Sequence, residues 1–172
     1  LIILCSKADL PSTKFSDVIS YEELLATGSE NFQWVSGDET DACGICYTSG
    51  TTGNPKGVVY THRSNTLHAL TQAAPDMLNL SSTDTIMPVV PLFHANGWSI
   101  AYTAPLVGSS IVFPGGDLSP SSLYNMLERG VTITAAVPTV WLLLLNFLQS
   151  EKKELSTLKR VVIGGSSCPR SA

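Results

Sequence analysis

The sequence has 172 residues, enough for about one domain. Apolar residues make up 44% and charged residues 14%, a composition that excludes an intrinsically disordered chain and can supply a core. A net charge of −4 argues against a broad basic surface for nucleic acid. The longest apolar stretch, residues 133–148, contains Pro138 and Asn146 and is too short to span a membrane.

Both ends of the sequence look cut. The chain begins at Leu1 inside an apolar run, and it stops at Ala172, just after Pro169. We therefore expect a fragment of a longer protein. The first 40 residues show little regular pattern. One short helix is predicted there, because Ser20 and Glu23 match a capping box, and it should end near Gly28.

From residue 42 onward, predicted strands and helices alternate. Apolar runs predict strands at 42–47, 58–61, 85–90, 111–113, 131–137 and 159–163. Periodicity, caps and prolines predict helices at 64–75, 98–107, 119–129 and 138–148. This order predicts an α/β fold with a parallel sheet and helices on both of its faces.

Two of these helices carry an apolar pattern that predicts how they pack. The first begins at Ser64 and places Leu67, Leu70, Ala74 and Met77 on one face, and Pro75 should kink or end it. The last, residues 138–148, is apolar nearly all round and should be buried, with Trp141 as a core residue.

Cys43 and Cys46 form a C-x-x-C pair, which could be a redox pair or half of a zinc site. No second C-x-x-C or His pair follows at metal-binding spacing. The segment 43–47 also has the composition of a buried strand, in which cysteine acts as a small apolar residue. We favour this structural interpretation, which suits a reducing compartment better than a disulfide scaffold does.

The segment 47–57, YTSGTTGNPKG, carries the clearest sign of chemistry. Its glycines permit positive φ angles and let backbone N–H groups approach a ligand closely. It also holds hydroxyl groups and one ammonium group, on Thr48, Ser49, Thr51, Thr52 and Lys56. Such donors form a nest suited to phosphate oxygens. The segment is not the P-loop of NTPases, because Lys56 lies between Pro55 and Gly57 and a strand follows it.

The same segment resembles the phosphate-binding loop of the adenylate-forming superfamily, which includes acyl-CoA synthetases, luciferases and nonribosomal adenylation domains. Residues 91–98, PLFHANGW, resemble the acyl-pocket motif of that family, and residues 162–166, VIGGS, resemble the segment that lines its acyl and adenine sites. The sequences of residues 89–94 and 137–141 are most similar to those of the fatty-acyl-CoA synthetase branch. Residues 1–172 would then be part of the layered N-terminal adenylation domain, and the C-terminal domain would be absent.

The resemblance implies an ATP-dependent ligase that uses Mg²⁺ and takes coenzyme A as a substrate. A carboxylate attacks the α-phosphorus of ATP to give an acyl-adenylate and pyrophosphate, and the thiol then displaces AMP. The implied contacts to ATP are Thr48, Ser49, Gly50, Thr51, Thr52, Gly53, Lys56 and Gly165, with Thr48 also near Mg²⁺. The implied contacts to the acid are His94, Trp98 and Gly164. The catalytic residues of the family would lie beyond Ala172, so the fragment alone should be inactive.

His94 and Trp98 each allow a structural and a functional interpretation. A lone His among apolar residues is often a core residue, but His94 follows the 85–90 strand, where open α/β sheets bind ligands. We expect His94 to position the carboxylate rather than to act as a base, because a carboxylate is already ionised near neutral pH. Trp98 could be plain core, whereas the resemblance makes it a gate to an acyl tunnel.

We expect an acid–thiol ligase that acts on a small carboxylic acid, in the first place a fatty acid, in the cytoplasm. A homodimer is the candidate assembly. One alternative is an adenylating enzyme that loads a carrier-protein thiol, and another is a non-catalytic nucleotide-binding module that kept the loop. The sequence after Ala172 would separate the enzyme from the module, because the remaining catalytic motifs of the family lie there.

Overall fold

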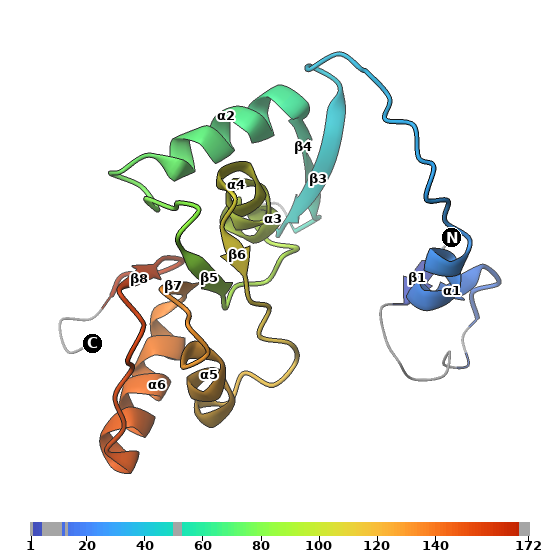
Figure 1. Cartoon of the computed structure of the whole chain (residues 1–172). Helices are drawn as coiled ribbons and strands as arrows, with labels where there is room; N and C mark the ends of the chain where they lie inside the picture. The colour runs from blue at the N-terminus through green and yellow to red at the C-terminus, as the bar shows by residue number, and fades with distance from the viewer. Residues whose placement is uncertain (1, 5–11, 13, 50–52, 169–172) are drawn as a thin grey trace. The chain divides into compact units, whose positions relative to one another are not determined.

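The chain divides into two units, residues 1–37 and 38–172, and each is described by itself. The computed structural model describes residues 2–4, 12, 14–49 and 53–168 (Figure 1). In the first unit, β1 (Ile2–Leu4) pairs in parallel with β2 (Val18–Ser20), and α1 (Tyr21–Ala26) follows. The predicted capping box is confirmed, since the Ser20 hydroxyl accepts from the Glu23 N–H and the Glu23 carboxylate accepts from the Ser20 N–H, both at 3.1 Å.

The second unit opens with an antiparallel ribbon of two strands, visible at the top of Figure 1. In this ribbon β3 (Ala42–Thr48) pairs with β4 (Lys56–Thr61). The prediction that the first strand is buried is wrong for most of its length, because Ile45 and Tyr47 are exposed and Cys46 alone is buried. Ile45 and Tyr47 lie on the face of the ribbon opposite to the one that carries Cys46, since alternate residues of a strand point to opposite faces.

α2 (His62–Ala73) follows the ribbon directly and ends where the sequence predicts. Ala74 adopts an extended conformation, as expected for a residue that precedes a proline. The predicted apolar face of the helix is not its buried face. Leu67 and Leu70 are more than half exposed, whereas Asn65 and Ala69 are buried on the side that packs against α4.

Four parallel strands form the central sheet, in the spatial order β6-β5-β7-β8. Their bounds are β5 (Thr85–Pro88), β6 (Ser110–Ile111), β7 (Ile133–Ala136) and β8 (Arg160–Ile163). The predicted parallel sheet is therefore confirmed. Because parallel strands end at the same edge, the segments that follow β5 and β8 both leave the sheet at its carboxyl edge, where open α/β sheets bind ligands.

Helices cover both faces of this sheet, as predicted (Figure 1). On one face, α4 (Ile100–Val107) packs with Ile86 of β5. On the other face, α5 (Pro120–Leu127) and α6 (Pro138–Glu151) pack around Met87, the next residue of the same strand. Alternate residues of β5 thus serve the two halves of the core.

α6 is only partly buried, contrary to the prediction from its apolar sequence. Trp141 and Leu144 face the core, and Trp141 is a core residue as expected, but Leu143 and Leu145 are exposed. A helix on the outside of a sheet turns one side toward it, so an apolar circumference does not bury the whole helix. No helix in the described ranges combines the length and apolar character needed to cross a membrane.

A buried carboxylate ties three segments of the second unit together. Asp84, just before β5, accepts hydrogen bonds from the Thr132 hydroxyl at 2.8 Å and from the Arg160 guanidinium at 2.7 Å. It also accepts from the backbone N–H and the hydroxyl of Ser81, both at 3.0 Å. Burial by itself raises the pKa of Asp84, but the hydrogen bonds from these partners outweigh burial and leave the pKa lowered.

Candidate functional site

The predicted phosphate-binding loop connects β3 to β4 at one end of the ribbon. Thr48 ends β3 and lies directly opposite Lys56, which begins β4, so their side chains leave the ribbon on the same face. Cys46 belongs to that face as well, because alternate residues of a strand share a face. Thr48, Ser49 and Lys56 are exposed, and Gly53 has a φ of +91°. The other predicted loop residues lie outside the described residues: Gly50, Thr51 and Thr52.

The predicted acyl-pocket segment forms a left-handed turn. α3 (Ala95–Trp98) and the following Ser99 have φ angles between 42° and 63°. The predicted helix at 98–107 is confirmed from Ile100 onward as α4, but Trp98 and Ser99 belong to this turn and not to the helix. A left-handed backbone costs a non-glycine residue about 1–2 kcal/mol, so contacts around the turn have to hold it.

His94 stands at the start of this turn and is exposed. Its N–H donates to the Pro91 carbonyl at 3.1 Å, and its carbonyl accepts from the Gly97 N–H at 2.9 Å. Gly97 itself cannot be replaced without movement, since a Cβ there would lie 2.7 Å from a methyl carbon of Leu92. The backbone thus fixes the place of His94, and its role toward a carboxylate stays a prediction.

Trp98 lies against Gly164, the first residue after β8. A Cβ on Gly164 would lie 2.8 Å from Cη2 of Trp98, and a Cβ on Gly165, which has a φ of +81°, would lie 3.0 Å from Cγ1 of Val137. The structure therefore brings Trp98 and Gly164, two of the residues predicted for the acid, into contact at the carboxyl edge of the sheet. Gly165 follows Gly164 directly in the same loop.

Asn96 is a residue of this region that sequence reasoning missed. The Cys46 thiol donates a hydrogen bond of 3.1 Å to Oδ1 of Asn96, and Nδ2 of Asn96 lies 3.9 Å from where a Cβ on Gly44 would be. Because Gly44, Cys46 and Thr48 alternate along β3, Asn96 covers the face of the ribbon that carries Thr48. The available signal was the Asn-Gly pair at 96–97, which is typical of positive φ angles.

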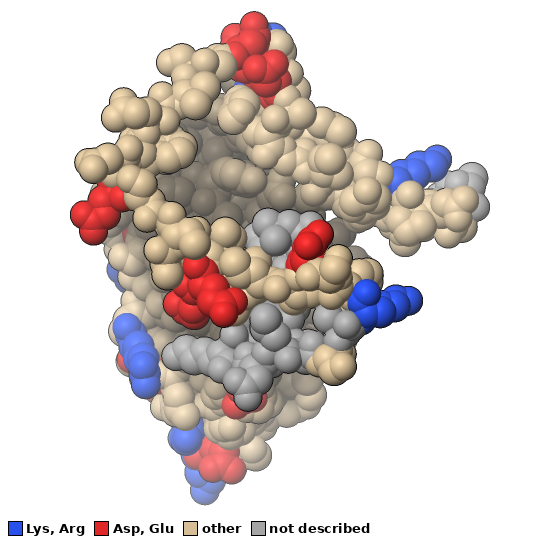
Figure 2. All heavy atoms as spheres, turned by 90° about the vertical axis from the view of Figure 1, so that its right-hand side faces the viewer, with Lys and Arg blue, Asp and Glu red and all other residues tan. Residues whose placement is uncertain are grey.

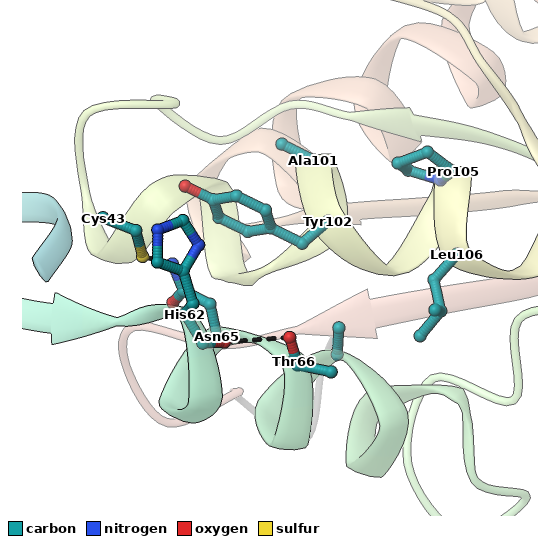
Figure 3. Close-up of a pocket in the computed structure, with 9 residues that line it drawn as sticks. Cys43, His62, Asn65, Thr66, Ala101, Tyr102, Pro105 and Leu106 are labelled. Carbon is teal, nitrogen blue, oxygen red and sulfur yellow. Dashed lines mark hydrogen bonds between the residues drawn. The ribbon is translucent and has the colours of Figure 1, made fainter. Parts of the chain in front are cut away.

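A pocket of about 440 Å³ lies between α2 and α4 (Figure 3). Its walls include Asn65 and Ala69 from α2 and Ala101, Tyr102 and Pro105 from α4. In Figure 3 the Tyr102 hydroxyl points toward the Cys43 end, whereas Pro105 lies at the opposite, apolar end. A second, smaller pocket shares Asn65 and Tyr102 with the first and extends to Asn96. The two pockets together therefore reach the left-handed turn.

Cys43 and Cys46 are free thiols that take part in packing contacts. Cys43 Sγ accepts a hydrogen bond from Nδ2 of Asn65 at 3.1 Å. Within the described residues, no group of three or more His, Cys, Asp or Glu side chains could hold a metal ion. The exposed hydroxyl of Thr48 is a hard oxygen ligand of the kind that Mg²⁺ accepts beside water and substrate phosphates, and its role toward Mg²⁺ stays a prediction.

The face drawn in Figure 2 is mostly uncharged, with Lys, Arg, Asp and Glu in small separate groups. This agrees with a sequence of which 14% is charged. Because the net charge of the chain is −4, an anionic ligand would depend on local donors such as the ribbon loop and Lys56.

Comparison with known proteins gives one consistent family. The family model described as AMP-binding enzyme matches residues 5–172. A medium-chain-fatty-acid–CoA ligase of Ectopseudomonas oleovorans is 48% identical over 161 residues, which are 93% of this chain and 30% of that protein. A long-chain-fatty-acid–CoA ligase of Thermus thermophilus is 49% identical over 154 residues, 89% of this chain and 28% of that protein.

A solved structure is also similar over most of the chain. The crystal structure of a long-chain-fatty-acid-CoA ligase from Archaeoglobus fulgidus superposes with a TM-score of 0.76 at 31% identity, and the match covers 90% of this chain and 32% of that one. The chain thus spans about three tenths of the length of the relatives that it matches.

Proposed function

Since the chain belongs to the family of AMP-binding enzymes, we propose that the full-length protein activates a carboxylic acid with ATP and transfers the acyl group to coenzyme A. In the first half-reaction a carboxylate oxygen attacks the α-phosphorus, and the bond to the β-phosphate breaks to release pyrophosphate. In the second, the sulfur of coenzyme A attacks the acyl carbon, AMP leaves, and the thiol proton is released. We assign residues 1–172 to part of the N-terminal adenylation domain.

The ribbon loop is our proposed site for the phosphates of ATP. Thr48 and Lys56 share one face at the mouth of the loop, and Gly53 supplies a positive φ angle there. Preorganised N–H, O–H and ammonium donors at this place would stabilise the charge that develops on the leaving pyrophosphate. When Mg²⁺ is bound it supplies further positive charge to the phosphates, and Thr48 is the residue of this chain proposed to hold it.

The acid is proposed to lie at the carboxyl edge of the sheet. Trp98 on Gly164 forms one wall there, and His94 would orient the carboxylate. The observation that carries the proposal is the contact of Asn96 with Cys46, because it sets this wall against the ribbon face that bears Thr48. We further propose that the apolar pocket between α2 and α4 receives the tail of the acid. Trp98, whose neighbour Ser99 lines the adjoining smaller pocket, is our proposed gate, as the family resemblance implies.

The substrate class is a fatty acid or a related apolar acid, as the names of the fatty-acid–CoA ligases among the relatives suggest. We place the protein in the cytoplasm, because the free thiols of Cys43 and Cys46 suit a reducing compartment. A homodimer remains the proposed assembly, as the family resemblance implies.

The test is acid-dependent exchange of labelled pyrophosphate into ATP by the full-length protein. Butyrate, octanoate and hexadecanoate are compared, and thioester formation is then measured with coenzyme A as the acceptor. Exchange with at least one acid, followed by thioester formation, is the expected result. Exchange without transfer to coenzyme A would favour a carrier-protein thiol as the acceptor, and the absence of exchange with every acid would overturn the proposal.

A further inference from the structure

The contact between Asn96 and Cys46 joins the two segments that the proposed function assigns to the two substrates. Cys46 lies two residues before Thr48 on the same face of β3, and Asn96 lies two residues after His94. The hydrogen bond between them is 3.1 Å long, and Cys46 is only 5% exposed. A movement of either segment relative to the other has to stretch or break this bond.

The left-handed backbone is what lets Asn96 reach the ribbon. Asn96 has φ 51° and ψ 44°, values that asparagine adopts more readily than most residues. The two residues that follow Asn96 hold the turn by close packing, Gly97 against Leu92 and Trp98 against Gly164. A strained turn held by several contacts keeps one arrangement, so a ligand that presses on Trp98 also acts on Asn96.

We propose that Asn96 and Cys46 are a positioning pair that couples binding of the acid to binding of ATP. This inference rests on the proposed function and adds regulation of the same site. An acid seated against Trp98 secures the turn, Asn96 then holds β3, and Thr48 is in place for the phosphates. By linkage, ATP must strengthen binding of the acid by the same factor. In this proposal Cys46 acts through Thr48 and Asn96 acts through Trp98, so both are positioning residues.

The coupling is measurable as a ratio of two dissociation constants in the full-length protein. The ligand is α,β-methylene ATP, which cannot release pyrophosphate, and its Kd is measured without and with a saturating acid. The acid is the one among butyrate, octanoate and hexadecanoate that supports the fastest exchange. For the wild type we expect the acid to lower the Kd about fivefold or more, the lower range of measured couplings.

Two variants remove the contact from its two sides. Asn96→Gly deletes the side chain but keeps a residue that accepts a positive φ angle, and Cys46→Ala deletes the donor. Each variant should bring the ratio to within about twofold of one, and the double variant should go no further, as expected for one shared interaction. The Kd measured without acid should change much less than the ratio does.

Matched variants separate this role from a structural one. Cys46→Ser keeps a donor and should retain the coupling, and Ile45→Ala, on the opposite face of the same strand, should leave the ratio unchanged. If Cys46→Ala does not fold, the comparison of Asn96→Gly, which should lose the coupling, with Cys46→Ser, which should keep it, decides the question. A ratio that persists in Asn96→Gly, or a wild type without coupling, overturns the inference while exchange activity stands. Absence of exchange in the wild type overturns the proposed function instead.

Discussion

Thr48 is the last residue of β3, and its side chain leaves the ribbon on the same face as that of Lys56. We expect Thr48→Ala to lower the rate of ATP–pyrophosphate exchange about 10²–10³-fold, because one preorganised donor at developing charge contributes that much. Thr48→Ser should keep most of the activity. Thr71→Ala, on the exposed part of α2, is the control, and an exchange rate in Thr48→Ala equal to that of the control would contradict the assignment.

A substitution at Gly164 tests the proposed role of Trp98 toward the acid. A methyl group at this position would lie 2.8 Å from the Trp98 ring, so Gly164→Ala should displace that ring. We expect the ratio of kcat/KM for hexadecanoate over butyrate to change about tenfold in Gly164→Ala, since two buried methylenes at about 0.8 kcal/mol each correspond to that factor. The KM for ATP should change little.

Gly116→Ala is the matched control for Gly164→Ala, because no atom lies within 4 Å of a Cβ built on Gly116. Trp98→Ala should shift the same ratio of acids as Gly164→Ala. If Trp98→Ala lowers the Tm strongly and leaves the ratio unchanged, Trp98 is a core residue and does not gate the acid.

The sequence predicts residues whose role follows from their type and spacing, such as the hydroxyls and Lys56 of the ribbon loop. The role of Asn96 was not predictable in this way. Its contact with Cys46 depends on five successive residues, 95–99, with positive φ angles, and four of these are not glycine. Nothing in hydrophobic periodicity signals such a turn, which is held by tertiary contacts against the preference of its own residues.

At the scale of elements, Asp84 joins the start of β5 to β7 and β8 through Thr132 and Arg160. We expect Asp84→Asn to lower stability by about 2–3 kcal/mol, because it leaves the guanidinium without its buried partner. The measurement is Tm by calorimetry of the full-length protein. Asp76→Asn, at an exposed position, should leave the Tm nearly unchanged, and equal Tm values for the two variants would refute the role of Asp84.

The same carboxylate predicts a pH dependence of known sign. Because the pKa of Asp84 is lowered in the folded state, its contribution to stability is fully present above the unfolded pKa of about 3.9. The contribution is lost as the pH falls through the lowered, folded-state pKa. Between pH 6 and pH 3 the Tm of the wild type should therefore fall more steeply than that of Asp84→Asn.

The pocket between α2 and α4 predicts an effect on chain length. Ala101→Leu would add three carbons to its wall, and each displaced methylene of the substrate loses about 0.8 kcal/mol, or about fourfold in affinity. We expect hexadecanoate to lose at least tenfold in kcat/KM relative to butyrate. Ala26→Leu, on exposed α1, is the control. An unchanged preference in Ala101→Leu would place the tail elsewhere.

The order of strands and helices was predictable because the hydrophobic pattern repeats at different intervals in strands and in helices. In addition, Pro75 marks the end of one helix, and Ser119 and Pro138 mark the beginnings of two others. The buried faces were less predictable. In α2 the sequence favours the side of Leu67, but Asn65 is buried because its amide finds a partner in Cys43 on the neighbouring ribbon. A hydrophobic stripe shows that a helix is amphipathic, whereas the partner that covers it is set by the tertiary fold.

At the scale of the whole molecule, one apolar surface of the second unit has no cover among the described residues. α6 and β8 line an apolar pocket of about 230 Å³ with side chains that include Leu145, Leu148, Val161 and Ile163. β8 is the last strand in the sheet order, so one side of its backbone lacks a pairing strand in the described part of the chain. Val161 and Ile163 are 45% and 41% exposed.

This surface predicts how residues 1–172 behave when they are produced alone. An open strand edge beside an apolar pocket invites association, so we expect the isolated chain to elute as large species in size-exclusion chromatography and to bind a hydrophobic dye strongly. Val161→Lys places a charge at the strand edge and should raise the monomer fraction several-fold, whereas Lys152→Arg, beyond the pocket, should not. The isolated chain should also form no thioester from any acid, ATP and coenzyme A, because it spans about three tenths of its relatives. A well-behaved monomer of residues 1–172 that turns over these substrates would contradict both expectations and would locate all the catalytic groups within this chain.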